Sequence, residues 1–312
     1  MSATTATLAP PPRGAHCDLE ELVRLRHSAR DLKLGRQRRA FSGLVGPHPS
    51  RFRGRGLEFE EVRTYQAGDD IRNIDWRVTA RSGRPHTKLF REERERPVLL
   101  LVDQSPTMFF GSRNCFKSVL ATHVAALLAW AAFQHNDRVG GLVFSGDDQA
   151  VIKPQRNTRT VLELIRHLHR FNGRLHRAQP APVTSLAQAL EELRRITRPG
   201  ANIFLISDFQ RCNGEGRKHL HHLCRHNDIT AVRIFDPLER QLPPAGCYAV
   251  TDGQRRATLF TGATELRRRY QAQFEEKSTA LKQLLGPMGI PLLELSTEDA
   301  PLPFFQKLLN GR

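Results

Sequence analysis

Three oxygen-bearing side chains alternate in the segment Asp103-Gln-Ser105-Pro-Thr107, which begins where an apolar run ends. That run, 98–102, reads Val-Leu-Leu-Leu-Val and is typical of a strand buried on both faces. In an extended loop the side chains at 103, 105 and 107 face one side, because alternate residues point the same way. One carboxylate and two hydroxyls suit a hard divalent cation such as Mg²⁺ or Mn²⁺. The spacing therefore predicts a cation site at the end of this strand.

A second carboxylate occupies a matching position farther along the chain. Asp208 follows the apolar run 203–206 with only Ser207 between them. Ligands of open α/β sheets gather outside the carboxyl ends of the strands, so Asp103 and Asp208 share a cleft if their strands are neighbours. The competing interpretation is that each aspartate only caps a loop or the helix that follows it. The two strand-terminal aspartates together favour the cation site.

A third loop offers two hydroxyls, Thr184 and Ser185, just before an expected helix. Ser185 and Gln188 have the spacing of a capping box, in which the serine hydroxyl satisfies a free backbone N–H group of the helix. On spacing alone, Thr184 remains free to face the cation.

The order of apolar patterns predicts the elements that must position these residues. Strands are expected at 98–102, 138–144, 202–206, 229–235 and 290–295, with 150–152 as a short antiparallel edge and 246–260 as a β-like stretch. Helices are expected at 113–134, 158–171, 185–197, 215–227, 264–285 and 301–309. Alternation of this kind predicts an α/β fold with a doubly wound, mostly parallel, Rossmann-type sheet.

The N-terminal third has a different character. Residues 1–17 are small, polar and proline-rich at their start and are expected to form a disordered tail. Residues 18–96 are expected to form a subdomain with one helix at 20–34, a basic loop at 36–56 and short strands over 57–90. The α/β domain is then expected to occupy 97–312.

Composition narrows the class of protein. The chain has 312 residues, 39% of them hydrophobic, and a formal net charge of +16. Its longest nearly apolar stretch, 124–133, is far shorter than a membrane span, and no secretion signal opens the chain, so a cytoplasmic location without a membrane span is expected. The positive charge leaves a polyanionic partner open, but a solvated basic surface is the favoured interpretation and nucleic acid is not the expected partner.

Several enzyme signatures are absent from the sequence. It contains no Walker-type glycine loop, no GxGxxG after a strand and no GxSxG elbow. Nucleotide hydrolysis by this chain is therefore not expected, and a non-enzymatic protein is favoured.

A longer signature lies ahead of the α/β domain and is similar to a known bacterial family. It runs through Arg53-Gly-Arg-Gly56-Leu-Glu-Phe59, Tyr65-Gln-Ala-Gly68-Asp69-Asp70-Ile-Arg72-Asn-Ile-Asp75-Trp76, Thr79-Ala-Arg81 and Phe90-Arg91-Glu92-Glu93. These residues closely resemble the family called domain of unknown function 58, and the Asp103 loop, Ser207-Asp208-Phe209 and Leu293-Glu294-Leu295-Ser296-Thr297 extend the resemblance over roughly 30–310. The resemblance implies a von Willebrand factor A-like domain with a metal-ion-dependent adhesion site. It also implies a functional link to MoxR-type AAA+ ATPases.

Transferred position by position, the adhesion-site pattern falls on five residues: Asp103, Ser105, Thr107, Thr184 and Asp208. One of them departs from the family pattern, because Thr107 stands where serine is usual. Its extra methyl group and stiff χ1 restrict how the hydroxyl is aimed, so weaker metal binding is expected.

These expectations combine into one functional hypothesis and two alternatives. The chain is expected to be an interaction or adaptor protein whose Mg²⁺ or Mn²⁺ leaves one coordination position for a partner's Asp or Glu. A MoxR-type ATPase is the expected partner, acting on an unknown client protein. A nucleic-acid-binding role is one alternative, but the chain has only three Tyr and two Trp for base stacking. A metal-dependent hydrolase is the other, and no general base is evident for it.

Overall fold

The computed structural model describes residues 11–32, 58–66, 69, 71–91, 96–146, 148–174, 185–210, 212, 214–251 and 256–310. They belong to two compact units. The smaller unit is Pro49–Glu95, and the larger one combines Met1–His48 with Arg96–Arg312.

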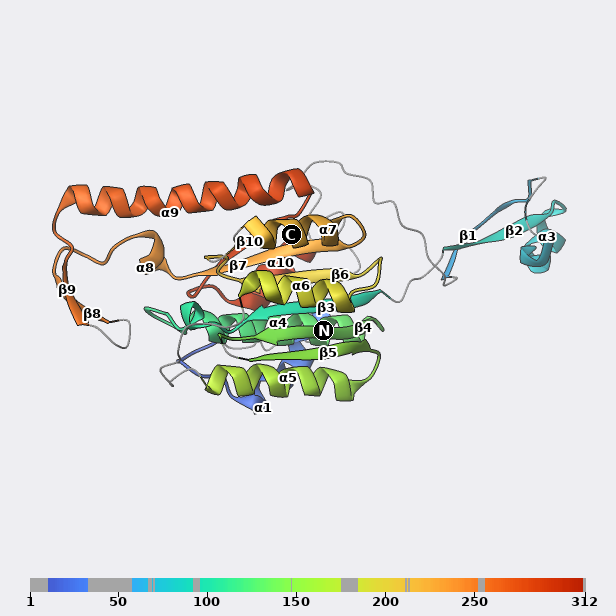
Figure 1. Cartoon of the computed structure of the whole chain (residues 1–312). Helices are drawn as coiled ribbons and strands as arrows, with labels where there is room; N and C mark the ends of the chain where they lie inside the picture. The colour runs from blue at the N-terminus through green and yellow to red at the C-terminus, as the bar shows by residue number, and fades with distance from the viewer. Residues whose placement is uncertain are drawn as a thin grey trace, which may run out of the picture. The chain divides into compact units, whose positions relative to one another are not determined.

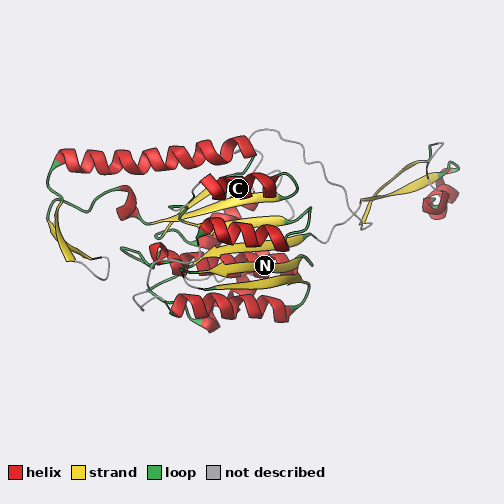
Figure 2. Ribbon diagram, viewed as in Figure 1, coloured by secondary structure: helices red, strands yellow, loops and turns green. Residues whose placement is uncertain are grey.

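The larger unit is built on a six-stranded sheet with the order β10-β7-β6-β3-β4-β5 (Figures 1 and 2). Its strands are β3 (Pro97–Asp103), β4 (Arg138–Phe144), β5 (Gln149–Gln155), β6 (Asn202–Ser207), β7 (Asp228–Phe235) and β10 (Leu292–Ser296). All neighbours pair in parallel except β4 and β5, which are antiparallel. The predicted α/β fold with a mostly parallel sheet and an antiparallel edge at 150–152 is confirmed.

Strand β3 lies at the point where the strand order reverses. From it the chain moves first to β4 and β5 on one side, and later to β6, β7 and β10 on the other. Val98 pairs with Asn202 and Val102 with Ile206, so β3 and β6 end side by side. Such a switch point is where doubly wound sheets place their ligands, and here it joins the strands that precede Asp103 and Asp208.

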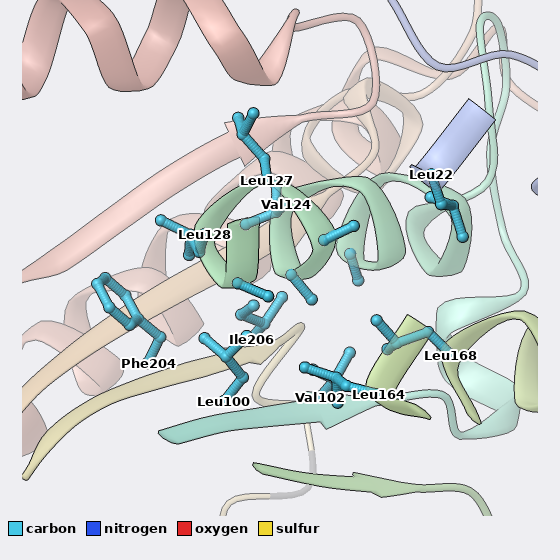
Figure 3. Packing of buried hydrophobic residues seen from close by; sticks show 14 of the residues in the cluster. Leu22, Leu100, Val102, Val124, Leu127, Leu128, Leu164, Leu168, Phe204 and Ile206 are labelled. Atoms are coloured by element: carbon cyan, nitrogen blue, oxygen red, sulfur yellow. The ribbon is translucent and has the colours of Figure 1, made fainter. Parts of the chain in front are cut away.

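Helices cover both faces of the sheet (Figure 2). The α-helices that the structure describes in the larger unit are α1 (Leu19–Ser28), α4 (Lys117–Gln134), α5 (Thr158–Gly173), α6 (Leu186–Ile196), α7 (Gly214–Cys224), α8 (Pro237–Arg240), α9 (Thr264–Leu285) and α10 (Pro301–Asn310). The short α8 lies beyond the end of β7 rather than on the sheet (Figure 1). Nearly every residue of α4 is buried, because sheet residues lie on one side of it and α1, α5 and α10 pack on others. Figure 3 shows Val124 and Leu128 of α4 beside Leu100 of β3 and Ile206 of β6.

Helix α1 and the residues before it pack within the larger unit, whereas the sequence grouped this helix with the β-rich segment. The indole Nε1 of Trp130 in α4 donates to the carbonyl oxygen of Leu22 in α1 at 3.1 Å. The Gly14 N–H donates to Asn114 at 2.9 Å, and the Gly14 carbonyl accepts from Phe116 at 3.0 Å. Part of the predicted tail 1–17 is therefore ordered by backbone hydrogen bonds. Residues 1–10 and the predicted loop 36–56 lie outside the described residues.

The smaller unit contains an unexpected helix. Strands β1 (Glu58–Thr64) and β2 (His86–Arg91) form an antiparallel pair, as predicted for a β-rich segment. Between them lie a 3₁₀ turn, η3 (Ile71–Asn73), and α3 (Trp76–Ser82), where only strands and turns were expected. Local caps explain the helix: the Asp75 carboxylate accepts from two backbone N–H groups, and Gly83 ends the helix at φ 69°.

Two further elements follow β7 and α8 in the larger unit. The strands β8 (Cys247–Thr251) and β9 (Arg256–Phe260) form a separate antiparallel hairpin, which leads into α9. In Figure 1 this hairpin lies beyond the C-terminal end of β7. Among the helices of the described residues, none combines the length and apolarity needed to cross a membrane.

Candidate metal centre

The loop after β3 brings its three predicted donors together, although not in the extended form expected. Pro106 starts a 3₁₀ turn, η4 (Pro106–Met108), and its fixed φ suits the first position of such a turn. The Asp103 Oδ1 accepts from the Ser105 N–H at 2.8 Å, which holds the start of the loop against the carboxylate. The Ser105 and Thr107 hydroxyl oxygens lie 3.1 Å apart, so they converge through their own hydrogen bond.

Strand β6 delivers Asp208 to the same place. The Ser207 hydroxyl donates to the Asp103 Oδ2 at 2.6 Å, which links the carboxyl ends of the two strands directly. Phe209 then takes the left-handed conformation at φ 55°, which costs a non-glycine residue about 1–3 kcal/mol. The turn is supported by a bond from the Phe209 N–H to the Ser207 hydroxyl at 3.0 Å.

These donors line a small hollow at the carboxyl edge of the sheet. Its cavity volume of about 10 Å³ is enough for one water molecule or an ion of similar size. The hollow is lined by Asp103, Ser105, Thr107, Phe144, Ser185, Leu186, Ser207 and Asp208. Four of the five predicted ligands therefore share one cavity. The fifth, Thr184, lies outside the described residues and stays a prediction.

Ser185, the neighbour of Thr184, caps helix α6, as its spacing from Gln188 predicted. The Ser185 hydroxyl accepts from the Gln188 N–H at 3.3 Å, and the Gln188 side chain accepts from the Ser185 N–H at 2.7 Å. This reciprocal pair is the predicted capping box at the start of α6. It positions the N-terminus of α6 at the wall of the hollow.

The electrostatics of the hollow suit a cation. Asp103 is only 4% exposed and Asp208 only 5%. Burial, and then the charge of Asp208, raise the pKa of Asp103 to about 6, against the opposing effect of hydrogen bonds from Ser207 and Ser105. Two buried carboxylates beside hydroxyl oxygens form a hard, anionic donor set, and this fits Mg²⁺ or Mn²⁺. Within the described residues no group of three or more His, Cys, Asp or Glu side chains is arranged for a metal.

A buried lysine, which sequence reasoning missed, lies behind Asp208. The Lys117 Nζ is 2.8 Å from the Asp208 Oδ2 and 2.7 Å from the Glu239 Oε1, and its side chain is 0% exposed. Burial alone would lower the pKa of Lys117, but the charges and hydrogen bonds of Asp208 and Glu239 outweigh it and raise that pKa. The one signal available was that Lys117 is the only Lys, Arg, Asp or Glu residue in 117–134.

A third aspartate, Asp236, follows strand β7 but has a different role. The Asp236 Oδ2 accepts from the Thr297 hydroxyl at 2.6 Å and from the Ser112 N–H at 2.8 Å, while its Oδ1 accepts from Leu238. Burial raises the pKa of Asp236, but these hydrogen bonds outweigh it and lower the pKa. Asp236 therefore caps α8 and links it by hydrogen bonds to the segments that carry Ser112 and Thr297. This places Glu239, also in α8, against Lys117.

Comparison with known proteins identifies the family. A family model described as "Protein of unknown function DUF58" matches residues 61–280, about two thirds of the chain. The chain belongs to the DUF58 family. This membership confirms the resemblance that the signature at 53–93 indicated.

Relatives of this DUF58 chain include mycobacterial proteins. "Uncharacterized protein Rv1480" of Mycobacterium tuberculosis (strain ATCC 25618 / H37Rv) and "Uncharacterized protein Mb1516" of Mycobacterium bovis are each 28% identical to it over 292 residues. The alignments cover 92% of this chain and 89% of each relative.

Similar solved structures are more distant. The conserved hypothetical protein BatB from Bacteroides thetaiotaomicron is 14% identical, with a TM-score of 0.41 over 69% of this chain and 98% of its own. An aerotolerance-related membrane protein from Bacteroides fragilis is also 14% identical, with a TM-score of 0.45 over 69% of this chain and 97% of its own. A von Willebrand factor type A structure from Catenulispora acidiphila is 16% identical, with a TM-score of 0.30 over 48% of this chain and 35% of its own.

Proposed function

We propose that this DUF58 protein is a non-enzymatic interaction protein that binds Mg²⁺ or Mn²⁺ and uses the ion to hold a partner's carboxylate. The ion would be held by the oxygens of Asp103, Ser105, Thr107, Thr184 and Asp208. The observation that supports the proposal is the convergence of Asp103, Ser105, Thr107 and Asp208 on one hollow at the switch point of the sheet.

The donor set explains why a partner would be needed. A divalent ion of this type prefers six oxygen ligands, so five donors from the chain leave one position. Asp208 is already paired with the Lys117 ammonium, so its negative charge is partly neutralised before the ion arrives. The bound ion would then keep an excess of positive charge. A partner's Asp or Glu carboxylate could both fill the sixth position and neutralise that excess.

The partner class comes from the family resemblance. We propose a MoxR-type AAA+ ATPase as the partner, in the cytoplasm. ATP turnover by the ATPase would drive assembly or remodelling of a client protein, with this chain as the adaptor. Of the described residues that line the hollow, none beyond the two aspartates is titratable, so no observation favours the hydrolase alternative.

A pull-down of the MoxR-type ATPase with the full chain tests the proposal, in Mg²⁺ and in EDTA. Asp103→Asn removes a negative charge from the hollow while keeping the shape of the side chain. Asp228→Asn is the matched control, because Asp228 starts β7 at the opposite edge of the sheet and pairs with Arg96. We expect recovery to be lost with EDTA or Asp103→Asn and kept with Asp228→Asn. Equal recovery in all of these samples would remove the metal from the mechanism.

A further inference from the structure

The ammonium group of Lys117 binds the same carboxylate that the metal would use. We infer that Lys117 is a built-in competitor of the divalent ion for Asp208 and so determines how tightly the site binds metal. This inference rests on the proposed metal-binding function. It adds a residue that is not a ligand and that the five-residue adhesion pattern does not contain.

The position of Lys117 gives its charge few alternatives. It is the first residue of α4, and its side chain is fully buried at 0% exposure, so water does not solvate the ammonium group. Its Nζ contacts one oxygen each of Asp208 and Glu239. Breaking a buried ion pair without a replacement is costly, so the ammonium must remain with at least one of these carboxylates.

The two aspartates of the hollow differ in how they are neutralised. Among the described residues, the donors to Asp103 are neutral groups, the Ser207 hydroxyl and the Ser105 N–H. Asp208 receives the Gln210 N–H on its Oδ1 at 3.1 Å and the charged Lys117 on its Oδ2 at 2.8 Å. A cation that enters the hollow must therefore share Asp208 with the ammonium or displace it.

Glu239 provides the group to which Lys117 can turn. Its side chain is 19% exposed, and its Oε1 lies 2.7 Å from the Lys117 Nζ. Gln210 also donates to this oxygen at 2.8 Å, so Glu239 is fixed on the loop that carries Asp208. When a divalent ion occupies the hollow, Lys117 can keep Glu239 and weaken its hold on Asp208. Glu239 thus determines how easily Asp208 is released to the metal.

This arrangement predicts effects of opposite sign for two variants. Glu239→Gln removes the alternative anion, so Lys117 binds Asp208 more strongly and the metal binds more weakly. Lys117→Met with Glu239→Gln removes one positive and one negative charge together, which leaves the net charge unchanged and frees the Asp208 Oδ2. The metal should then bind more tightly. A lysine with only a structural role would destabilise the protein when replaced but would not move metal affinity in opposite directions.

The experiment is calorimetric titration of the full chain with MnCl₂ and with MgCl₂. We expect Glu239→Gln to raise the Kd about tenfold and the double variant to lower it about tenfold, because the first strengthens and the second removes the hold of the Lys117 ammonium on the Asp208 carboxylate. Adding Asp208→Asn to the double variant should abolish the gain. Circular dichroism without metal verifies that each variant is folded. If the double variant does not fold, Glu239→Gln alone still tests the inference.

The outcomes separate this inference from the function on which it rests. Binding by the natural protein with the same Kd in Glu239→Gln and in the double variant would overturn the role of Lys117 and leave the metal site intact. No binding by the natural protein or by any variant would overturn the metal site itself. Binding by the double variant alone would support Lys117 as a competitor that blocks the site until a partner contributes its carboxylate.

Discussion

His123 should make the larger unit sensitive to acid. It lies in α4 and is only 2% exposed, and its Nε2 has no hydrogen-bond partner among the described residues. A carboxylate oxygen of Glu21 in α1 lies 3.8 Å from this nitrogen, too far for a hydrogen bond. Burial lowers the pKa of His123 from 6.5 to about 4, because a charged imidazolium would lose its hydration there.

The size and sign of the effect follow from this shift. In the unfolded chain His123 takes up its proton near pH 6.5, whereas in the folded chain it does so only near pH 4. Between these values the unfolded state binds more protons than the folded state. The free energy of unfolding is therefore unaffected by His123 well above pH 6.5 and decreases as the pH falls below it. The loss is about 3 kcal/mol over the whole window and about 2.5 kcal/mol by pH 4.5.

Urea unfolding from pH 7.5 to 4.5 measures the effect in a Trp76→Phe background. Trp130 of α4 is then the only tryptophan, so its fluorescence follows the larger unit. His123→Leu removes the titrating group, and its stability relative to the parent should rise by about 2.5 kcal/mol on going from pH 7.5 to pH 4.5. His169→Leu, which removes an exposed histidine of α5, should follow the parent curve. Parallel curves for His123→Leu and the parent would refute the reasoning.

Two further predictions concern the metal loop and the sheet. Thr107→Ser removes the methyl group that restricts χ1, so calorimetry should show tighter Mn²⁺ binding; unchanged or weaker binding would show that the threonine hydroxyl is already well aimed. Gly141→Ala should destabilise the larger unit by about 1–3 kcal/mol in urea, because a Cβ at 141 would lie 2.3 Å from the Leu100 carbonyl oxygen of β3. Gly173→Ala is its control, since nothing lies within 4 Å of the added Cβ, and equal effects of the two changes would contradict the packing argument.

Local sequence patterns were sufficient to locate most of the candidate site. Asp103 and Asp208 each follow an apolar run, and such a boundary marks the end of a buried strand. Because the ends of parallel strands meet at one edge of a sheet, the sequence predicts that the two aspartates lie together if their strands are neighbours. The structure supplies that condition, since β3 pairs with β6. The capping box of Ser185 and Gln188 was predictable for a different reason, since its hydrogen bonds join residues only three positions apart.

The contacts of Lys117 beside this site are not local, and only the tertiary structure revealed them. Lys117 meets Asp208 across 91 positions of sequence and Glu239 across 122, and no spacing pattern encodes such pairs. Docking of α1 on α4 likewise depends on packing between segments about 100 residues apart, such as Leu22 and Trp130. The periodicity of apolar residues in one segment indicates which of its faces is buried and which is exposed to water. Which charges then meet in that core depends on how all the segments pack, and here packing placed an ammonium group beside the proposed metal site.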